Sequence, residues 1–271
     1  MKIQAIAKDL IPGPLWPLLR RATANMVYFG FKYRCPLCNA RLRKLLNFGV
    51  SFPVLKELEV VGGGSREEAE CPACGSSDRE RLVYLYMEYV LGIRTRGCRL
   101  LHVAPEPSLS RRLARLSNLD YLTADISGQN VMVRMDITDI DFEDVYFDVI
   151  VCNHVLEHII DDRQAMRELY RVLKPGGTAI LQVPMSKRLN ATLEDQTVVS
   201  EVDRERVFGQ HNHVRIYAAD YLDRLMSVGF EVDMFQWWTA DERFGAATNR
   251  FRLLKDETLY VAQKPLTATS Q

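Results

Sequence analysis

The sequence predicts an α/β fold: a doubly wound, Rossmann-like parallel sheet preceded by a small cysteine-rich module. The first observation is residues 147–184, which read as a buried strand, a polar turn, an amphipathic helix, a Pro-Gly-Gly break and a second buried strand. Phe147–Cys152 is short, apolar and rich in β-branched residues, as a parallel strand buried on both faces requires. The second observation is two Cys-Pro-X-Cys pairs that precede this pattern. With 271 residues, 47% of them apolar, the chain can form one sizeable core and one small module.

The other predicted elements alternate as a doubly wound sheet requires. Asp161 and Asp162 can cap the helix of the 147–184 run, whose apolar stripe extends to Leu173, and Pro175-Gly176-Gly177 ends it. The remaining predictions are a helix at 78–91, strands at 99–103, 121–124 and 131–135, a helix at 108–116, a polar insertion at 184–208, a helix at 217–228, and strands at 230–238 and 258–262 around an excursion at 244–256.

The paired cysteines predict a structural zinc site formed by Cys35, Cys38, Cys71 and Cys74. Two thiolates two residues apart can bind one ion, and two such turns complete a tetrahedral four-thiolate site with no open position. Unligated thiols or a redox Cys-X-X-Cys motif are the alternatives, and the presence of two copies argues against both. Thiol-based metal binding suits a reducing compartment, so we expect a cytoplasmic protein.

The segments FDVIVCNHVLEH and RELYRVLKPGG, each beside a predicted strand, resemble class I S-adenosylmethionine-dependent methyltransferases of the type 11-like group. The resemblance covers roughly Arg99 to Pro265, and the chain also looks like a bacterial subgroup that joins a two-CxxC zinc module to such a domain. It implies a seven-stranded methyltransferase sheet, S-adenosylmethionine as cofactor and a methyl-transfer activity. The predicted organisation is an N-terminal segment at 1–30, a zinc-ribbon-like module at 31–77 and a methyltransferase domain at 78–265.

The resemblance also implies a set of cofactor-binding residues at the strand ends. Asp125 stands where the family's acid takes the ribose hydroxyls, Asp136 where a carboxylate meets the adenine amino group, and Asn153 beside the methionine portion. For each aspartate alone, the alternative is a strand-end cap. The predicted cofactor-binding residues are Ala104, Glu106, Asp125, Ile126, Asp136, Ile137 and Asn153.

The loop after the first strand departs from the family pattern. His102 stands where an acid is usual, and Ala104, Glu106 and Ser108 occupy the glycine positions. Glycine allows close backbone approach and positive φ, which the interleaved prolines cannot supply. Either the prolines pre-set the loop and Glu106 attracts the amino or sulfonium group of the cofactor, or the domain has kept the fold and lost the cofactor.

Histidines are the candidates for acid-base chemistry, because an oxygen or nitrogen acceptor benefits from a base near neutral pH. His154 and His158 flank the end of the fourth strand, and His213 precedes the last helix. The predicted catalytic residues are therefore His154, His158 and His213, and the alternative is that they only orient loops. His211, Asn212 and His213 are too few to predict a second metal site.

Charge is uneven along the chain, which bears on its partners. Residues 1–99 hold 16 basic and 9 acidic residues, a net of +7, although the whole chain is neutral. The first-ranked acceptor is a small molecule or carbohydrate. RNA, bound by the basic stretch Arg20–Lys44 and its aromatic residues, ranks second, and a non-catalytic adaptor third. No apolar run is long enough to span a membrane. Residues 3–28 could contact a membrane surface, and the first-ranked alternative is that this segment docks on the protein itself.

Overall fold

The computed structural model describes residues 16–266. Seven strands form one sheet in the order β14-β15-β10-β9-β6-β7-β8. Neighbouring strands from β10 to β8 are parallel, and β15 runs antiparallel to both of its neighbours. This order confirms the predicted doubly wound, seven-stranded methyltransferase sheet. The strands are β6 (Cys98–Val103), β7 (Leu119–Asp125), β8 (Val133–Arg134), β9 (Phe147–Cys152), β10 (Leu173–Ile180), β14 (Glu231–Gln236) and β15 (Thr258–Gln263).

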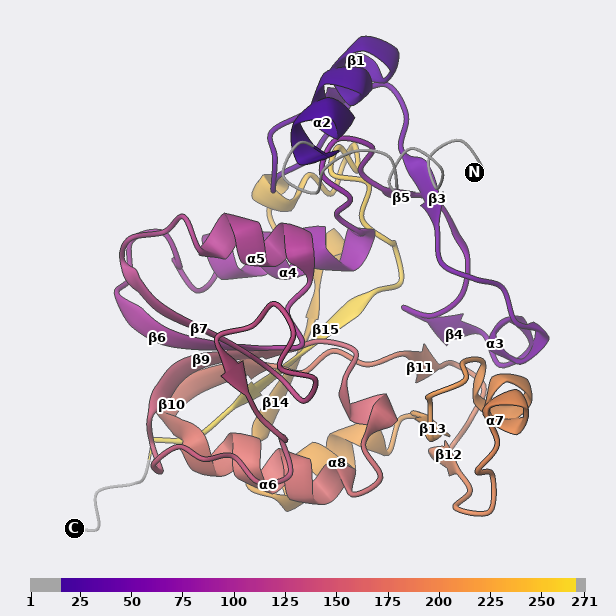
Figure 1. Ribbon diagram of the computed structural model, residues 1–271, viewed down its shortest axis with the longest axis vertical. Helices are drawn as coiled ribbons and strands as arrows, with labels where there is room; N and C mark the ends of the chain where they lie inside the picture. The colour runs from indigo at the N-terminus through magenta and orange to yellow at the C-terminus, as the bar shows by residue number, and fades with distance from the viewer. Residues whose placement is uncertain (1–15, 267–271) are drawn as a thin grey trace.

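Helices cover both faces of the sheet (Figure 1). Helices α4 (Asp78–Tyr89) and α5 (Pro107–Leu113) lie on one face, and α6 (Asp162–Val172) and α8 (Tyr221–Ser227) lie on the other. Alternate residues of the central strands therefore enter two cores. Leu100 belongs to the core under α4 and Leu101 to the core under α6, and both are fully buried.

One predicted boundary is wrong. Leu173 was expected in the last turn of a helix, but α6 ends at Val172 and Leu173 already pairs with Phe147 as the first residue of β10. Lys174 precedes a proline, which disfavours helical backbone there. The Pro-Gly-Gly segment thus lies inside the strand, at an irregularity in the register between Leu173 and Thr178.

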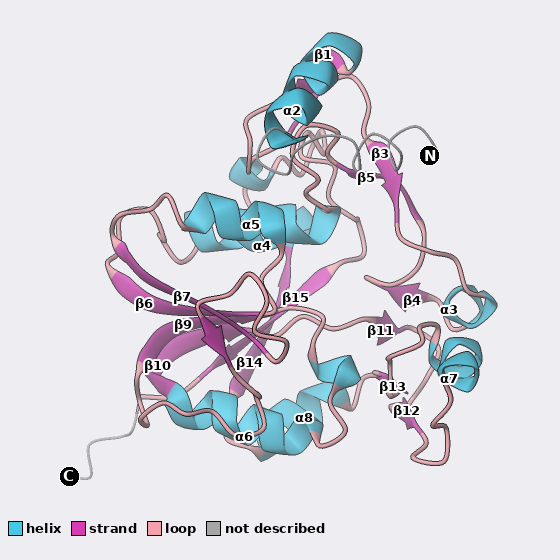
Figure 2. Cartoon of the chain, viewed as in Figure 1, coloured by secondary structure: helices cyan, strands magenta, loops and turns pink. Residues whose placement is uncertain are grey.

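The N-terminal part is a small module with an arm (Figure 2). Helix α2 (Trp16–Val27) precedes the β1–β2 hairpin (Phe29–Arg34, Arg41–Leu42), and β3 (Leu46–Phe48) pairs with β5 (Arg66–Glu70). Residues 49–65 between these two strands, here called the arm, contain α3 (Pro53–Glu57) and β4 (Val60–Val61). The predicted membrane-contacting segment begins outside the described residues. Within residues 16–266, no helix combines the length and apolar character needed to cross a bilayer.

The arm contacts the segment that follows β10. This segment, residues 184–216, is here called the insertion and contains β11 (Met185–Ser186), β12 (Leu193–Glu194), α7 (Glu201–Phe208) and β13 (Arg215–Ile216). Strand β4 of the arm pairs with β11, and Leu55 packs with Phe208 and Ile216 in a small third core. Two segments far apart in the sequence therefore meet beside the carboxyl ends of the central strands (Figure 1).

The module and the large domain share one hydrophobic core. Leu42 and Cys71 of the module belong to the same buried cluster as Leu82 of α4 and Val149 of β9. Helix α4 begins with a capping box, in which Ser77 and Glu80 satisfy each other's backbone amides. The predicted domain boundaries at 30/31, 77/78 and 265 stay predictions.

Candidate functional site

Two neighbouring strand ends carry non-glycine residues in a left-handed backbone conformation. Ala104, directly after β6, has φ +45°, and His154, two residues after β9, has φ +54°. Hydrogen bonds hold both, since the Ala104 amide donates to the Ala124 carbonyl (2.8 Å) and the His154 amide to the Gln182 carbonyl (2.7 Å). Such strain concentrates at functional sites. The carboxyl ends of parallel strands are also where ligands bind in this fold.

Glu106 is the centre of the unusual loop. Its carboxylate contacts His102 Nε2 at 2.8 Å and accepts from Asn153 Nδ2 at 3.2 Å, while His102 Nδ1 lies 2.9 Å from the Tyr121 hydroxyl. Burial alone would raise the pKa of Glu106, but the hydrogen bonds from His102 and Asn153 hold it below its usual value. An ionised carboxylate therefore lies at the end of β6, within the loop that Pro107 closes as the first residue of α5.

The two predicted aspartates each cap a turn. Asp125 Oδ1 accepts from the Ser127 amide at 2.7 Å and from its hydroxyl, and Asp136 Oδ1 accepts from the Thr138 amide and hydroxyl at 2.9 and 2.8 Å. In each case Oδ2 accepts no hydrogen bond from the described residues. Each side chain is therefore oriented through one of its two oxygens.

The two predicted isoleucines differ in exposure. Ile126 is 58% exposed, whereas Ile137 is 3% exposed and packs in the core under α6. Their roles toward the adenine ring stay predictions.

Four buried polar atoms near the ends of β9 and β15 have no hydrogen-bond partner among the described residues. They are Asn153 Oδ1, His154 Nε2, Glu157 Oε2 and Glu257 Oε2, and we call these four residues the polar cradle. His154 Nδ1 lies 3.3 Å from Glu157 Oε1, and Gln182 Nε2 donates to Glu257 Oε1 at 2.6 Å. Because buried polar groups are nearly always satisfied, such a group of orphans indicates a place for a ligand, ion or water.

The arm forms one wall of the polar cradle. A Cβ added at Gly62, which has φ +78°, would lie 3.0 Å from Glu257 Oε1 and 3.4 Å from His154 Cε1. The Gly62 carbonyl accepts from Arg79 Nη1 (3.0 Å) and Arg66 Nη1 (3.1 Å). Only glycine allows this approach, so the Gly62-Gly63-Gly64 sequence packs closely against the cradle.

Burial dominates the electrostatics of the cradle. It raises the pKa of Glu157 to about 8 and of Glu257 to about 7, although Arg79 lies close enough to lower both in part. Burial, followed by the charge of Arg79, holds the pKa of His154 well below its usual value. At neutral pH the His154 ring is therefore uncharged.

The three predicted catalytic histidines come together. The rings of His158 and His213 lie 4.7 Å apart between centroids, and Glu157 joins them from the 3-10 turn η1 (Leu156–His158). Burial lowers the pKa of His213 to about 3 and lowers that of His158. His211, two residues before His213, is exposed.

The four cysteines predicted to bind zinc converge. The Cys35 and Cys74 sulfurs are 3.7 Å apart and those of Cys38 and Cys71 are 3.8 Å apart, and all four lie within 4.8 Å of one another. The cluster joins the β1–β2 loop to the turn after β5 and fits a zinc module. Ser108 Oγ of α5 donates to the Cys74 carbonyl at 2.8 Å, which links the cluster to the large domain.

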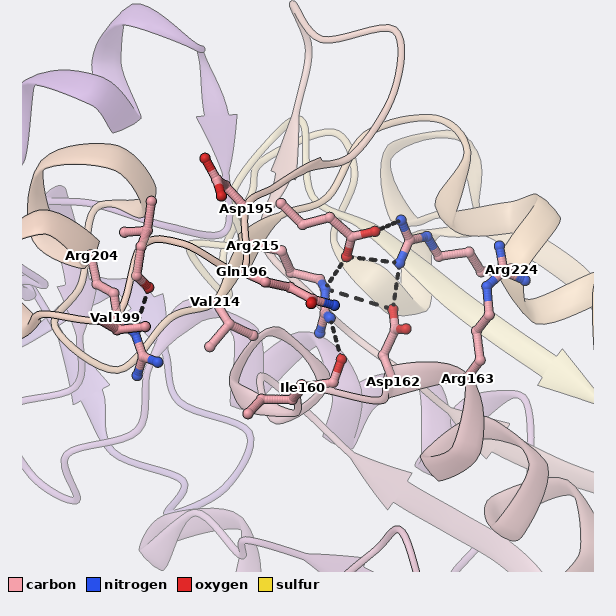
Figure 3. Close-up of a pocket in the computed structure, with 12 residues that line it drawn as sticks. Ile160, Asp162, Arg163, Asp195, Gln196, Val199, Arg204, Val214, Arg215 and Arg224 are labelled. Atoms are coloured by element: carbon pink, nitrogen blue, oxygen red, sulfur yellow. Dashed lines mark hydrogen bonds and ion pairs between the residues drawn. The ribbon is translucent and has the colours of Figure 1, made fainter.

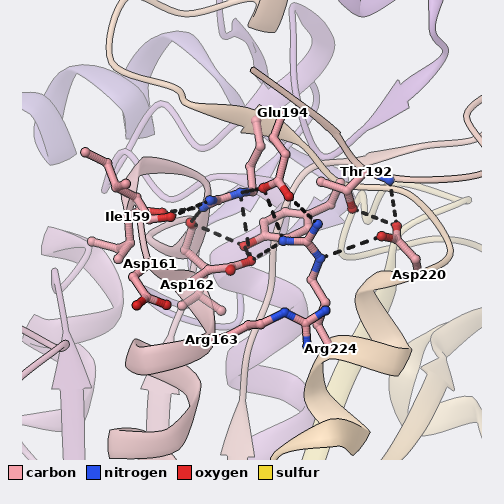
Figure 4. A network of polar contacts seen from close by, with 12 residues as sticks. Ile159, Asp161, Asp162, Arg163, Thr192, Glu194, Asp220 and Arg224 are labelled. Carbon is pink, nitrogen blue, oxygen red and sulfur yellow. Dashed lines mark hydrogen bonds and ion pairs between the residues drawn. The ribbon is translucent and has the colours of Figure 1, made fainter. Parts of the chain in front are cut away.

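A cavity of about 580 Å³ lies beside the insertion (Figure 3). A network of ion pairs borders it: Arg224 contacts Asp162 (2.9 Å) and Glu194 (2.8 Å), and Arg215 contacts Glu194 (2.9 Å) (Figure 4). The Tyr217 hydroxyl also donates to Asp162 at 2.7 Å. These contacts fix the insertion to α6 and α8 rather than leaving it as a loose flap.

Sequence reasoning missed several residues of this site. Glu257 lies between the predicted excursion at 244–256 and the predicted strand at 258–262, Gln182 lies in a buried run, and Arg79 lies in the first turn of the predicted helix at 78–91. Each reaches the cradle from a different segment, and nothing local in the sequence signals that. The Gly-Gly-Gly run was the one available sign of a close backbone approach.

Comparison with known proteins agrees with this architecture. Residues 89–181 match the family described as a methyltransferase domain. The chain is 38% identical to a ubiquinone/menaquinone biosynthesis C-methyltransferase UbiE of Idiomarina loihiensis over 25% of this chain and 27% of that protein. It is 26% identical to a probable S-adenosylmethionine-dependent methyltransferase of Mycolicibacterium smegmatis over 44% of each chain.

Among solved structures, the [4+2]-cyclase SpnF is similar at 18% identity with a TM-score of 0.49, covering 81% of this chain and 100% of that one. The chain spans 20–27% of the length of three curated relatives that it matches, two UbiE C-methyltransferases and a demethylmenaquinone methyltransferase. The match nevertheless spans β6 to β10, the parallel part of the sheet. Residues 89–181 are therefore similar to the methyltransferase domain family, and a four-cysteine module precedes them in the chain.

Proposed function

We propose that the protein is an S-adenosylmethionine-dependent methyltransferase that acts on a small-molecule or carbohydrate-type acceptor bound beneath the arm. The observation that carries the proposal is the polar cradle: unpartnered, buried polar atoms at the carboxyl end of β9, beside a loop strained at Ala104. The arm and the insertion enclose it. This enclosure suits methyl transfer, in which alignment and exclusion of water supply much of the rate.

The strand-end residues fit the cofactor. The free oxygens of Asp125 and Asp136 suit the ribose hydroxyls and the adenine amino group, and Asn153 Oδ1 suits a donor on the methionine portion. The family usually has an acidic residue at position 102, where this chain has a histidine. Glu106, whose carboxylate contacts His102 Nε2, supplies the negative charge from the loop instead. When bound, S-adenosylmethionine supplies an electrophilic methyl group on its sulfonium sulfur.

His154 is the proposed proton acceptor for an oxygen or nitrogen nucleophile. Its Nε2 is buried and unpartnered, while Glu157 Oε1, 3.3 Å from Nδ1, orients the ring. His158 and His213 stay candidates that position the acceptor. The low pKa of His154 makes it a weak base, so the acceptor's proton must be held close to Nε2 for transfer to occur.

The four cysteines are proposed to bind one structural Zn2+ ion. With all four thiolates ligated, no coordination position remains for chemistry. The ion would instead fix the ends of β1, β2 and β5, from which the arm extends toward the cradle.

An RNA acceptor is the second candidate, favoured by one surface feature. Phe29 and Phe31 of β1 are 53% and 76% exposed, and the Arg41 guanidinium lies 5.6 Å from the Phe31 ring centre. Exposed aromatic rings beside arginine can stack on bases. The enclosed cradle favours the small molecule. RNA binding should be measured against salt concentration in the wild type and in an Arg41→Ala, Arg43→Ala, Lys44→Ala variant. Binding that falls steeply with salt and is lost in the variant would make RNA the first-ranked acceptor.

Calorimetric titration with S-adenosylmethionine tests the cofactor. Asp125→Ala should weaken binding by about 10-fold, since one charge-assisted hydrogen-bonding group is worth roughly 1.5 kcal/mol or more. Asp120→Ala, on the same strand but 72% exposed, should leave binding unchanged. Absence of binding to the wild type at millimolar ligand would reject both enzyme functions and leave a non-catalytic adaptor.

A further inference from the structure

We propose that Glu157, His158 and His213 form a second metal site, separate from the four cysteines, that takes a divalent first-row ion such as Zn2+. One carboxylate and two imidazoles offer ligand atoms that all lie within 4.8 Å of one another. Ligands around a tetrahedral zinc ion are separated by roughly 3.4 Å, so side-chain rotation suffices to close the site. Two histidines and one carboxylate are a recurrent donor set for Zn2+ and Fe2+.

The unpartnered oxygen of Glu157 points to a ligand at this place. Glu157 is 1% exposed, and while Oε1 faces His154 Nδ1, Oε2 is buried without a partner among the described residues. A buried carboxylate oxygen without a donor is unfavourable unless a proton or a cation satisfies it. A metal ion held between Oε2 and the two imidazoles would do so.

His158 is oriented as a ligand. Its Nδ1 lies 3.1 Å from the Asn212 carbonyl oxygen, which can only accept, so Nδ1 carries the proton and the Nε2 lone pair is free. This is the usual arrangement of a metal-binding histidine, whose second nitrogen donates to a carbonyl or carboxylate.

The backbone holds the three ligands in place before any ion binds. The Val214 amide donates to the Glu157 carbonyl at 2.9 Å, which ties the segment of His213 to the turn η1. Arg215 donates to the carbonyls of Leu156 (2.9 Å) and Ile160 (2.8 Å) on either side of Glu157 and His158. Arg215 also forms an ion pair with Glu194, and this acidic partner offsets part of the positive charge of Arg215.

Such a site would differ from the cysteine site in keeping open positions. Three protein ligands leave at least one position for an exogenous oxygen. His158 is half-buried, which gives an ion a route of entry. If the proposed function is right, the open position would lie next to His154 and could bind an oxygen of the acceptor.

Metal analysis of the tag-free full-length chain, dialysed against Zn2+ and then against metal-free buffer, tests the proposal. We expect about two ions per chain in the wild type and one in Glu157→Gln and His213→Gln. His211→Gln, an exposed histidine two residues from His213, is the matched control and should keep two. Loss of an outer-shell partner weakens metal binding by roughly 10- to 100-fold. Loss of a direct ligand should weaken binding of the second ion by more than this.

Replacing Zn2+ by Co2+ distinguishes the two sites. The cysteine site should give thiolate-to-cobalt charge-transfer absorption, whereas the second ion should add only weaker ligand-field bands that disappear in Glu157→Gln. Circular dichroism and retention of the cysteine-bound ion show that the variants fold. A single, thiolate-bound ion in the wild type, or a second ion that survives both substitutions, would overturn the proposal. These readouts do not require methyl transfer, so they stand whether or not the proposed function holds.

Discussion

At the scale of single residues, Ala104 is a strained residue that departs from the glycine expected in this loop. A left-handed conformation costs an L-residue about 1–2 kcal/mol, whereas glycine adopts it without that cost. The strain persists because the Ala104 amide is fixed to Ala124 and the loop is closed by Pro107.

Replacing Ala104 by glycine should therefore stabilise the protein. We expect the free energy of unfolding to rise by about 0.5–1 kcal/mol in urea titrations, since relief of strain exceeds the entropy that glycine adds to the unfolded chain. Ala114→Gly is the control, because Ala114 has φ −59° and gains nothing from glycine, so it should lose about 0.5–1 kcal/mol. Equal destabilisation of both variants would contradict the strain at Ala104.

Glu257 should make stability depend on pH. Burial raises its folded-state pKa from 4.5 to about 7, so the folded state binds the proton more tightly than the unfolded state. This contribution is complete below about pH 4.5 and is lost as pH rises through 7. Glu257→Gln should therefore raise the free energy of unfolding by roughly 1–3 kcal/mol at pH 8 and change it little at pH 5.

Asp256→Asn is the control for this pH dependence. Asp256 is the preceding residue, and its side chain is 55% exposed in an ion pair with Lys187. Denaturant unfolding at several pH values should show the wild-type slope in this variant and a flatter profile in Glu257→Gln. An unchanged slope in Glu257→Gln would mean that this carboxyl is already ionised in the folded protein.

At the scale of elements, the arm and the insertion build the site together. Strand β4 pairs with β11, and Leu55 packs on Phe208, so neither segment is free to move alone. Gly62 then lies against Glu257 and His154. The proposed acceptor side of the site therefore depends on contact between two segments about 120 residues apart in sequence.

Gly62→Ala should disturb this contact. Both Gly62 (φ +78°) and Gly92 (φ +64°) are left-handed, so alanine at either costs about 1 kcal/mol. Only at Gly62 does the methyl group meet Glu257 and His154, whereas at Gly92 the nearest atom is Thr95 Oγ1 at 3.7 Å. Gly92→Ala should therefore lower stability without changing the binding of acceptor analogues. Gly62→Ala should lower stability and also weaken that binding, as measured by calorimetry. Equal binding by both variants would place the acceptor elsewhere.

At the scale of the whole molecule, the cysteine module is part of the main core. Cys71 and Leu42 share a buried cluster with α4 and β9, and Arg81 of α4, fully buried, donates to carbonyls of Ala69 and Phe251. Loss of zinc should therefore affect the large domain as well as the module.

Cys71→Ser should abolish zinc binding at the cysteine site and lower the thermal stability of the whole chain in one transition. Structural zinc contributes directly to folding free energy, so we expect a loss of several kcal/mol. Cys98→Ala is the control, since Cys98 is buried outside the cluster and should keep the ion. Two separate thermal transitions in Cys71→Ser would show that the module and the domain fold independently.

The local sequence by itself determined the sheet, the cysteine cluster and the strand-end positions of Asp125, Asp136 and Asn153. These depend on short-range patterns: β-branched runs, Cys-Pro-X-Cys spacing, and polar residues that directly follow a strand. Only the tertiary structure decided that Gly62, Arg79 and Glu257 border His154, and that Glu157 meets both His158 and His213. Those contacts join segments through burial and long-range packing, which leave no periodic or spacing signal in any one stretch of the chain.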